Sequence, residues 1–190
     1  MPACAKSHEP SLPALLLALI LAACGPADHE TRFQLEGVEA EWSNGQLQVT
    51  VEQSLTLSSE ARNALVHGVP LSIETTLSLR ESGKRTPVAD FSESHEIRYL
   101  PLSDHYQLSR QVGTDVQTFP RLRHVLAALS TTRMSVWTGA IPAGDYELLL
   151  RTQLDRMRMP PPMRLPVHMS AEWRHDSRWT SWPLKIEPGA

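Results

Sequence analysis

The chain has 190 residues, of which 41% are hydrophobic and 21% are charged, as is typical of folded globular proteins and not of disordered or fibrous ones. The formal net charge is −3 and there is no basic block, so we expect no nucleic-acid partner. The only cysteines are Cys4 and Cys24. The rest of the chain can therefore form neither a disulfide nor a cysteine-ligated metal site.

The N-terminal segment carries the pattern of an export signal. Residues 12–23 are apolar apart from one proline, and this stretch is shorter than the about 20 residues that a membrane-spanning helix needs. The sequence Leu21-Ala22-Ala23-Cys24 that follows resembles a bacterial lipobox. We therefore predict a lipoprotein signal peptide over residues 1–23, lipidation of Cys24 and a short linker over residues 24–32. The alternative is an ordinary secretory signal that contains a cysteine.

The residues after Cys24 bear on where the anchor is held. Pro26 follows Gly25, where the lipoproteins that this signal resembles carry an aspartate for retention in the inner membrane. The resemblance to Gram-negative lipoproteins then implies the periplasmic face of the outer membrane, with N-terminal acyl chains, palmitate among them, as the membrane contact. The alternatives are the inner membrane or a soluble periplasmic protein.

Alternating apolar and polar residues predict a hairpin at the start of the domain. Val38, Ala40 and Trp42 alternate with polar residues, as on a strand with one buried face. Asn44-Gly45 follows, the dipeptide that a two-residue hairpin turn prefers, and residues 47–57 form a long returning strand.

The next elements are a short helix and three further strands. Residues 60–67 are predicted to be a helix that Ser58 or Ser59 caps and Gly68 ends, and Pro70 begins a strand. Residues 81–92 are interpreted as a polar connection. Residues 96–102 and 105–112 are predicted to be two strands.

The second half of the chain is predicted to hold one helix and at least two strands. Thr118 is expected to cap the helix, with Pro120 in its first turn, and a long strand follows the turn at residues 143–145. The proline-rich residues 159–163 cannot pair as a central strand, and we interpret them as a stiff crossover before a final strand or hairpin.

These elements predict a mainly β fold and a single domain over residues 33–190. We expect an antiparallel β-sandwich of about eight strands with two short helices. A partly closed β-barrel is the alternative.

No catalytic motif emerges from the pattern of polar residues. The histidines lack metal-ligand spacing within one element, although His95 and His105 could approach each other across a hairpin, and His168 and His175 could do so near the C-terminus. The motif G-x-S-x-G is absent. Asp104-His105 and His175-Asp176 are adjacent pairs, and adjacent strand residues point to opposite faces. We predict no catalytic residue, no metal and no cofactor, and a hydrolase is the less favoured alternative.

Aromatic and basic residues near the C-terminus suggest a binding surface. The candidates are Trp173, Trp179, Trp182, Arg156 and Arg158. Trp173 and Trp179 would face together if residues 171–184 formed one unbroken strand, and the two arginines could meet an anionic headgroup or a partner protein. Core filling is the alternative role of the tryptophans, and solvation that of the arginines.

Four segments, residues 64–79, 96–108, 119–129 and 159–184, resemble a proteobacterial family known as a domain of unknown function, number 4390. The resemblance extends from Phe33 to Ile186. It implies an exported or envelope-anchored β-rich protein and no particular activity. A link to a membrane-bound sensor kinase is also implied. We therefore expect a non-enzymatic envelope lipoprotein that acts as an interaction module, with an envelope protein as partner. A carrier of lipid or of a small ligand is the alternative.

Overall fold

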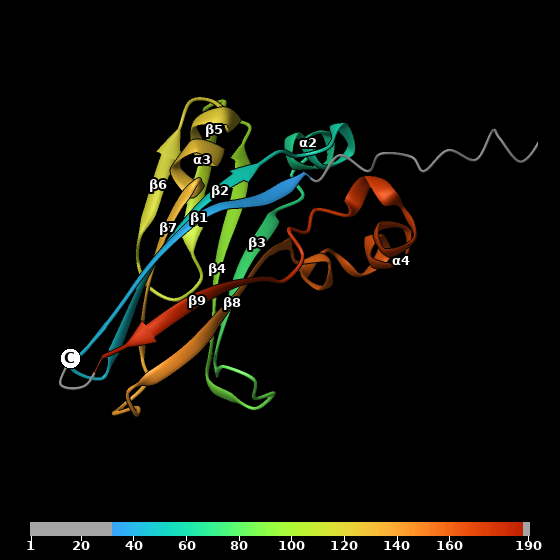
Figure 1. Cartoon of the computed structure of the whole chain (residues 1–190). Coiled ribbons are helices and arrows are strands. Elements are labelled where there is room, and N and C mark those ends of the chain that lie inside the picture. The colour runs from blue at the N-terminus through green and yellow to red at the C-terminus, as the bar shows by residue number, and fades with distance from the viewer. Residues whose placement is uncertain (1–31, 188–190) are drawn as a thin grey trace, which may run out of the picture. The chain divides into compact units, whose positions relative to one another are not determined.

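The computed structural model describes residues 32–187, and these contain nine strands in two antiparallel sheets (Figure 1). The small sheet has the order β1-β2-β7 and consists of β1 (Phe33–Ser43), β2 (Gln46–Leu55) and β7 (Thr131–Trp137). The large sheet has the order β6-β5-β4-β3-β8-β9. Its strands are β3 (Leu71–Glu81), β4 (Pro87–Leu100), β5 (His105–Arg110), β6 (Val116–Phe119), β8 (Gly144–Leu154) and β9 (Thr180–Ile186).

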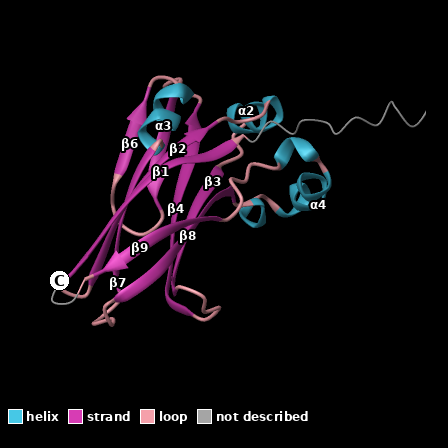
Figure 2. Cartoon of the chain, viewed as in Figure 1, coloured by secondary structure: helices cyan, strands magenta, loops and turns pink. Residues whose placement is uncertain are grey.

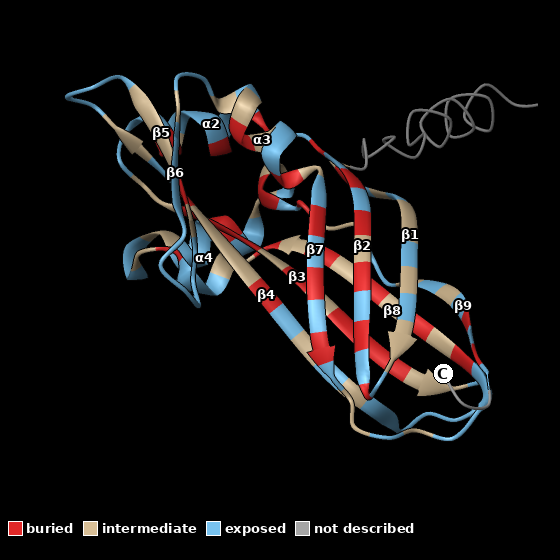
Figure 3. Cartoon of the chain, turned by 90° about the vertical axis from the view of Figure 1, so that its left-hand side faces the viewer, coloured by how far each residue is buried: buried red, intermediate tan, exposed pale blue. Residues whose placement is uncertain are grey.

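Three α-helices accompany the sheets, as Figure 2 shows: α2 (Ser59–Val66), α3 (Leu122–Leu129) and α4 (Pro161–Met169). Two 3-10 turns, η1 (Arg156–Arg158) and η2 (Ala171–Trp173), lie on either side of α4 in the sequence. All three helices lie at the same end of the sheets, where their buried residues share one apolar cluster; in Figure 3 α2 and α3 lie next to each other.

Two apolar clusters hold the sheets and helices together. One lies between the sheets and includes Val49 from β2, Leu77 from β3 and Leu148 from β8, all almost fully buried. The other lies at the helical end, where Leu65, Val125 and Val167 from the three helices meet Phe33 and Ile97. Burial alternates along β2 and β7 (Figure 3), because one face of the small sheet packs on the large one. The predicted β-sandwich is therefore confirmed, and the barrel alternative is wrong because the described strands form two separate sheets.

A buried polar contact also joins the two sheets. The amide of Gln53 on β2 donates to the carbonyl oxygen of Leu129 (2.8 Å) and accepts from the hydroxyl of Thr152 on β8 (2.7 Å). Thr152 Oγ1 lies 3.1 Å from Thr75 Oγ1 on β3. Because buried polar groups are costly unless they are paired, this chain of contacts fixes how the sheets lie against each other.

The first hairpin and the first helix agree with the sequence. Asn44 and Gly45 both have positive φ values, 52° and 79°, as a two-residue turn of type I′ requires. Ser58 caps α2, because its hydroxyl oxygen accepts from the backbone N–H of Ala61 (3.1 Å).

Two strands correct the sequence interpretation. The predicted connection over residues 81–92 is wrong beyond Pro87, where β4 begins and pairs with β3. Proline is tolerated there because it is the first residue of the strand. Strand β7 was not predicted, although Thr132, Met134 and Val136 alternate as buried residues along it.

Two helical features also differ from expectation. Thr118 does not cap a helix, because it lies in β6 and pairs with Gln107; α3 begins only at Leu122, after Pro120. The predicted crossover at residues 159–163 instead leads into α4, a third helix, whose first turn contains Pro161. A proline fits there because first-turn N–H groups have no acceptor within the helix.

Candidate functional site

A cavity of about 360 Å³ opens where β4, β5 and β6 approach α3 and β7. Its lining includes five ionisable residues: Glu93, His95, Arg110, Asp115 and Arg133. Its volume falls in the range of sites that bind small ligands or a few residues of a partner. The cavity is therefore a candidate binding site.

Strand alternation brings the charged residues of β4 into this cavity. Glu93 and His95 share the face of β4 that carries the buried Ile97, because every second residue of a strand faces the same way. Arg110 on β5 lies opposite His95 in the register. The same alternation that builds the core therefore directs an acid, an imidazole and a guanidinium to one place.

Glu93 is a buried carboxylate whose desolvation is only partly offset by its neighbours. It is 8% exposed, and its Oε1 lies 2.9 Å from Arg110 Nε and 3.2 Å from His95 Nε2. Neither nitrogen is aligned to donate a hydrogen bond to this oxygen among the described residues. Desolvation raises the pKa of Glu93, and the positive charge of Arg110 only partly opposes this effect.

His95 is shifted in the opposite direction. Desolvation lowers the pKa of its imidazole, and the charge of Arg110 lowers it further. Both groups are therefore displaced toward their neutral forms, and perturbed groups that line a cavity often mark functional sites. Such a pair offers a proton donor and acceptor, or a place for a ligand with complementary hydrogen bonds.

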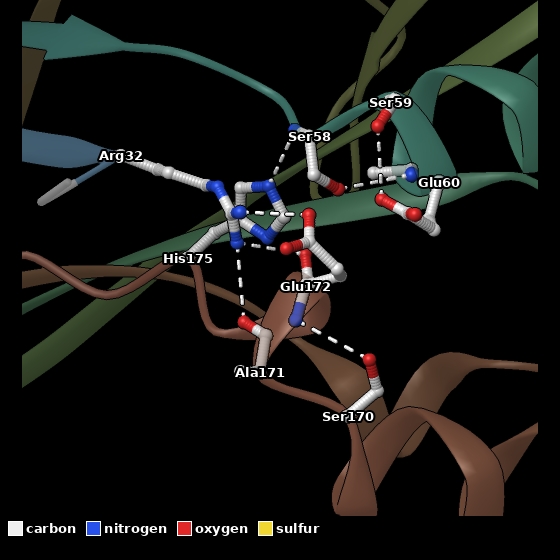
Figure 4. A network of polar contacts seen from close by, with 9 residues as sticks. Arg32, Ser58, Ser59, Glu60, Ser170, Ala171, Glu172 and His175 are labelled. Atoms are coloured by element: carbon white, nitrogen blue, oxygen red, sulfur yellow. Dashed lines mark hydrogen bonds and ion pairs between the residues drawn. The ribbon is translucent and has the colours of Figure 1, made fainter. Parts of the chain in front are cut away.

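A second polar cluster lies at the helical end, around His175 (Figure 4). His175 is 2% exposed; its Nε2 accepts from the backbone N–H of Ser58 at 2.9 Å, and its Nδ1 has no hydrogen-bond partner in the described chain. Burial lowers the pKa of His175 to about 4, so the imidazole is neutral at physiological pH. His175 therefore supports the start of α2 as a buried acceptor.

Arg32 ties the beginning of the described chain to this cluster. Its guanidinium donates to the backbone carbonyls of Ala171 and Glu172 and forms an ion pair of 2.7 Å with the Glu172 carboxylate (Figure 4). These contacts hold the start of β1 against η2, so we assign Arg32 a role in stability.

The predicted tryptophans do not form one surface. Trp173 lies buried in η2, within the core cluster at the helical end. Trp182 is half-buried on β9 and packs on the cluster between the sheets. Trp179 is 48% exposed and lines a separate cavity of about 330 Å³ with Arg80 and Asp90. The unbroken strand that would have brought Trp173 and Trp179 together is absent, because β9 begins only at Thr180.

The predicted arginines lie in η1, away from the cavity that contains Glu93. Arg156 is half-buried, and Arg158 pairs with Asp155 at 3.1 Å. His95 and His105 do not approach across their hairpin, because His95 pairs with Arg110 and His105 with Leu100.

Several expectations concern residues that the structure does not describe. The signal peptide over residues 1–23, Cys24 and the linker up to residue 31 lie outside the described range. Among residues 32–187, no helix has the length and apolar composition needed to cross a membrane. In the same range, no group of three or more His, Cys, Asp and Glu side chains is arranged to hold a metal ion.

Sequence reasoning missed the cluster of Glu93, His95 and Arg110, although the signal was present. Extending the inward alternation of Ile97 backward assigns His95 and Glu93 to the same face, and extending that of Leu108 forward assigns Arg110 to it. The register between β4 and β5 then brings the three together, which the sequence alone does not specify.

Comparison with known families gives one match. A family model described as a domain of unknown function, DUF4390, matches residues 30–183. No curated protein and no solved structure matches the chain.

Proposed function

The chain belongs to the DUF4390 family of domains of unknown function, and from this premise we propose that it is a non-enzymatic, lipid-anchored binding module of the cell envelope. The anchor is Cys24, at the end of the lipobox-like sequence Leu21-Ala22-Ala23-Cys24, and the module faces the periplasm from the outer membrane. Several acyl chains make such an anchor stable, because each buried methylene contributes about 0.8 kcal/mol and a single chain is marginal.

The observation that carries the binding role is the carboxylate of Glu93. It is buried at the wall of a 360 Å³ cavity, and its Oε1 lacks an aligned hydrogen bond. A buried acceptor without a hydrogen bond costs about 1–3 kcal/mol. Binding that aligns a donor with this carboxylate, from the ligand or from the neighbouring Arg110, recovers part of this cost.

The charges of the cavity define the ligand class. An amide or amino N–H suits Glu93, and a carbonyl or carboxylate oxygen suits the guanidinium of Arg133, which forms no ion pair with the described residues. A polar segment of a protein carries both kinds of group. The partner is therefore an envelope protein whose exposed peptide segment enters the cavity, and a membrane-bound sensor kinase is one protein of that kind.

The alternative functions have less support. A lipid carrier needs an apolar space between the sheets, but that region is filled by side chains such as Leu77, Leu79 and Leu148. A hydrolase of the nucleophilic type needs an activated hydroxyl, but Thr132 at the cavity already donates to Leu129 and accepts from Gln53. The geometry therefore favours binding over either activity.

In-cell crosslinking tests this proposal. A photoreactive residue replaces Gln117, an exposed residue of the cavity wall, and the crosslinked proteins are identified by mass spectrometry. We expect one specific envelope protein, with a yield that falls about tenfold in Glu93→Gln, because a charge-assisted hydrogen bond contributes about 1.5–3 kcal/mol.

The matched control variant is Glu96→Gln, on the same strand. Glu96 is paired with Arg98 at 2.7 Å and does not line the cavity, so its substitution should leave the yield unchanged. A crosslinker in place of Gln48, exposed on β2, controls for the surface in general. A yield insensitive to Glu93→Gln, or an equal yield from position 48, would contradict the proposal.

A further inference from the structure

Helix α4 carries an apolar face that points away from the protein. Met163 and Val167 pack on the core cluster at the helical end, as in an ordinary surface helix. The opposite face has a second stripe at spacing i, i+3, i+4 and i+7, formed by Pro162, Leu165, Pro166 and Met169, all of them exposed. Leu165 is 71% exposed and Met169 is 77% exposed. Such a stripe on a soluble surface marks a site of contact with something apolar.

The surroundings of this stripe are basic, although the whole chain is acidic. From residue 156 to residue 178 the sequence contains five arginines and two carboxylates, whereas the chain has a net charge of −3. Glu172 and Asp176 are paired with Arg32 and Arg151, and Arg158 is paired with Asp155 just before this segment. Arg164 within α4 donates through its Nε to the carbonyl oxygen of Met159 at 3.0 Å and forms no ion pair with the described residues. An apolar stripe beside an arginine that no carboxylate neutralises is the pattern of a helix that lies in the interface of an anionic bilayer.

The covalent chain holds α4 close to the predicted anchor. Arg32 donates to the carbonyl of Ala171, two residues after α4 ends. Seven residues lie between Cys24 and Arg32, and the eight Cα-to-Cα steps that join the two span at most about 28 Å when fully extended. Acylated Cys24 therefore restricts the helical end of the domain to the neighbourhood of the bilayer surface.

We propose that the outward face of α4, with Arg164 at its border, docks on the anionic phospholipid surface in which Cys24 is anchored. This inference rests on the proposed acylation of Cys24. The helix lies parallel to the membrane with Leu165 and Met169 at the level of the headgroups, while Arg164 meets the phosphates. The cavity with Glu93 is lined by residues of β4, β5, β6, α3 and β7, and none of its lining residues belongs to α4. Docking through α4 therefore leaves the cavity open to the periplasm.

The test measures the depth of α4 in the full chain, processed in a Gram-negative host and reconstituted in vesicles. In a Cys4→Ala background, Leu165→Cys carries an environment-sensitive fluorophore, and Leu102→Cys, in the turn between β4 and β5 and fully exposed, carries the same label as a control. The vesicles contain phosphatidylcholine alone or with one quarter phosphatidylglycerol. With the anionic lipid, we expect a blue-shifted emission and quenching by spin-labelled lipid at position 165 only.

A charge variant tests the choice of an anionic surface. Arg164→Gln should lower the ratio of docked to undocked protein about fivefold, since each basic residue at an anionic surface contributes a factor of that size. The matched control is Arg85→Gln, in the exposed turn between β3 and β4, which should leave the docked fraction unchanged. High salt should reproduce the effect of Arg164→Gln.

The outcomes separate the inference from the proposed anchor. Intact mass reports the acyl chains on Cys24 in the same samples. An acylated chain whose label at position 165 behaves like the label at position 102 would overturn the docking and leave the anchor intact. A label at position 165 that is shielded in proportion to protein concentration, without lipid dependence, would assign the face to a second copy of the chain and overturn the inference. A chain without acyl groups would overturn the anchor, and the inference with it.

Discussion

Glu93 Oε1 lies 3.2 Å from Nε2 of His95, two residues along the same strand, and burial shifts the pKa values of the two groups in opposite directions. Each shift favours the neutral form, so the pair gains little from being ionic. The buried carboxylate of Glu93 lowers the folding stability, and binding of a ligand can supply the hydrogen bonding that it lacks in the free protein.

The first prediction is that Glu93→Gln stabilises the free protein at neutral pH. A carboxyl group whose pKa is raised on folding contributes stability at low pH and loses it as the pH rises through the folded-state pKa. The substitution removes the buried charge, and we expect a gain on the order of 1 kcal/mol in the free energy of unfolding at pH 7. Urea unfolding measures it.

The pH dependence provides the control for this prediction. Below the ordinary pKa of 4.5, Glu93 is protonated in both the folded and unfolded states, so the gain should shrink when the same measurement is made at pH 4. A variant that is less stable than the natural chain at pH 7 would mean that the carboxylate is well compensated in the free protein.

The second prediction concerns His175, whose pKa falls from 6.5 to about 4 on folding. The unfolded chain takes up a proton first, so stability is retained above pH 6.5 and lost as the pH falls from there toward 4. The loss attributable to His175 is about 3 kcal/mol, since one pKa unit corresponds to about 1.4 kcal/mol. Unfolding free energies between pH 7 and pH 4 measure the slope.

In His175→Gln this part of the slope should disappear, because the side-chain amide keeps an acceptor for the Ser58 N–H and does not titrate in this range. His168→Gln, at an exposed position of α4, should keep the slope of the natural chain. Equal slopes in the three proteins would show that the imidazole of His175 is not buried in its neutral form.

The third prediction concerns the contact between the sheets. Gln53→Ala removes one of the two hydrogen-bond partners of the Thr152 hydroxyl, Thr75 being the other, and opens a small void beside the carbonyl of Leu129. We expect a loss of about 3 kcal/mol in the free energy of unfolding. Gln48→Ala, exposed on the same strand, should change stability by less than about 0.5 kcal/mol. Similar losses in both variants would mean that the buried network contributes little.

Local patterns predicted the parts of the fold that depend on neighbouring residues. The turn at Asn44-Gly45 and the cap at Ser58 follow from backbone φ preferences and from one side-chain hydrogen bond. The proline-rich residues 159–163 did not predict α4, because prolines interrupt strands and also occur in the first turn of a helix. Strand β7 carries the alternating pattern of Thr132, Met134 and Val136, but it lies at a sheet edge between a helix and a turn, and its pairing with β2 is what fixes its place.

The candidate site was harder to predict because it depends on register. Glu93 and Arg110 are far apart in the sequence, and the pairing of β4 with β5 decides that they meet. The tryptophans, in contrast, are neighbours in the sequence that the fold separates. Trp173 and Trp182 are close in the sequence, but η2 and the late start of β9 place them in different core clusters.

The central claim is that Cys24 anchors this domain in the envelope, and the intact mass of the membrane-extracted chain tests it most directly. We predict a chain that begins at Cys24 and carries the added mass of a diacylglyceryl group and an N-linked acyl chain. In Cys24→Ser the acyl mass should be absent, and the protein should be released or remain as an uncleaved precursor. A natural chain without acyl mass, or a Cys24→Ser chain that is still processed and lipidated, would contradict the account.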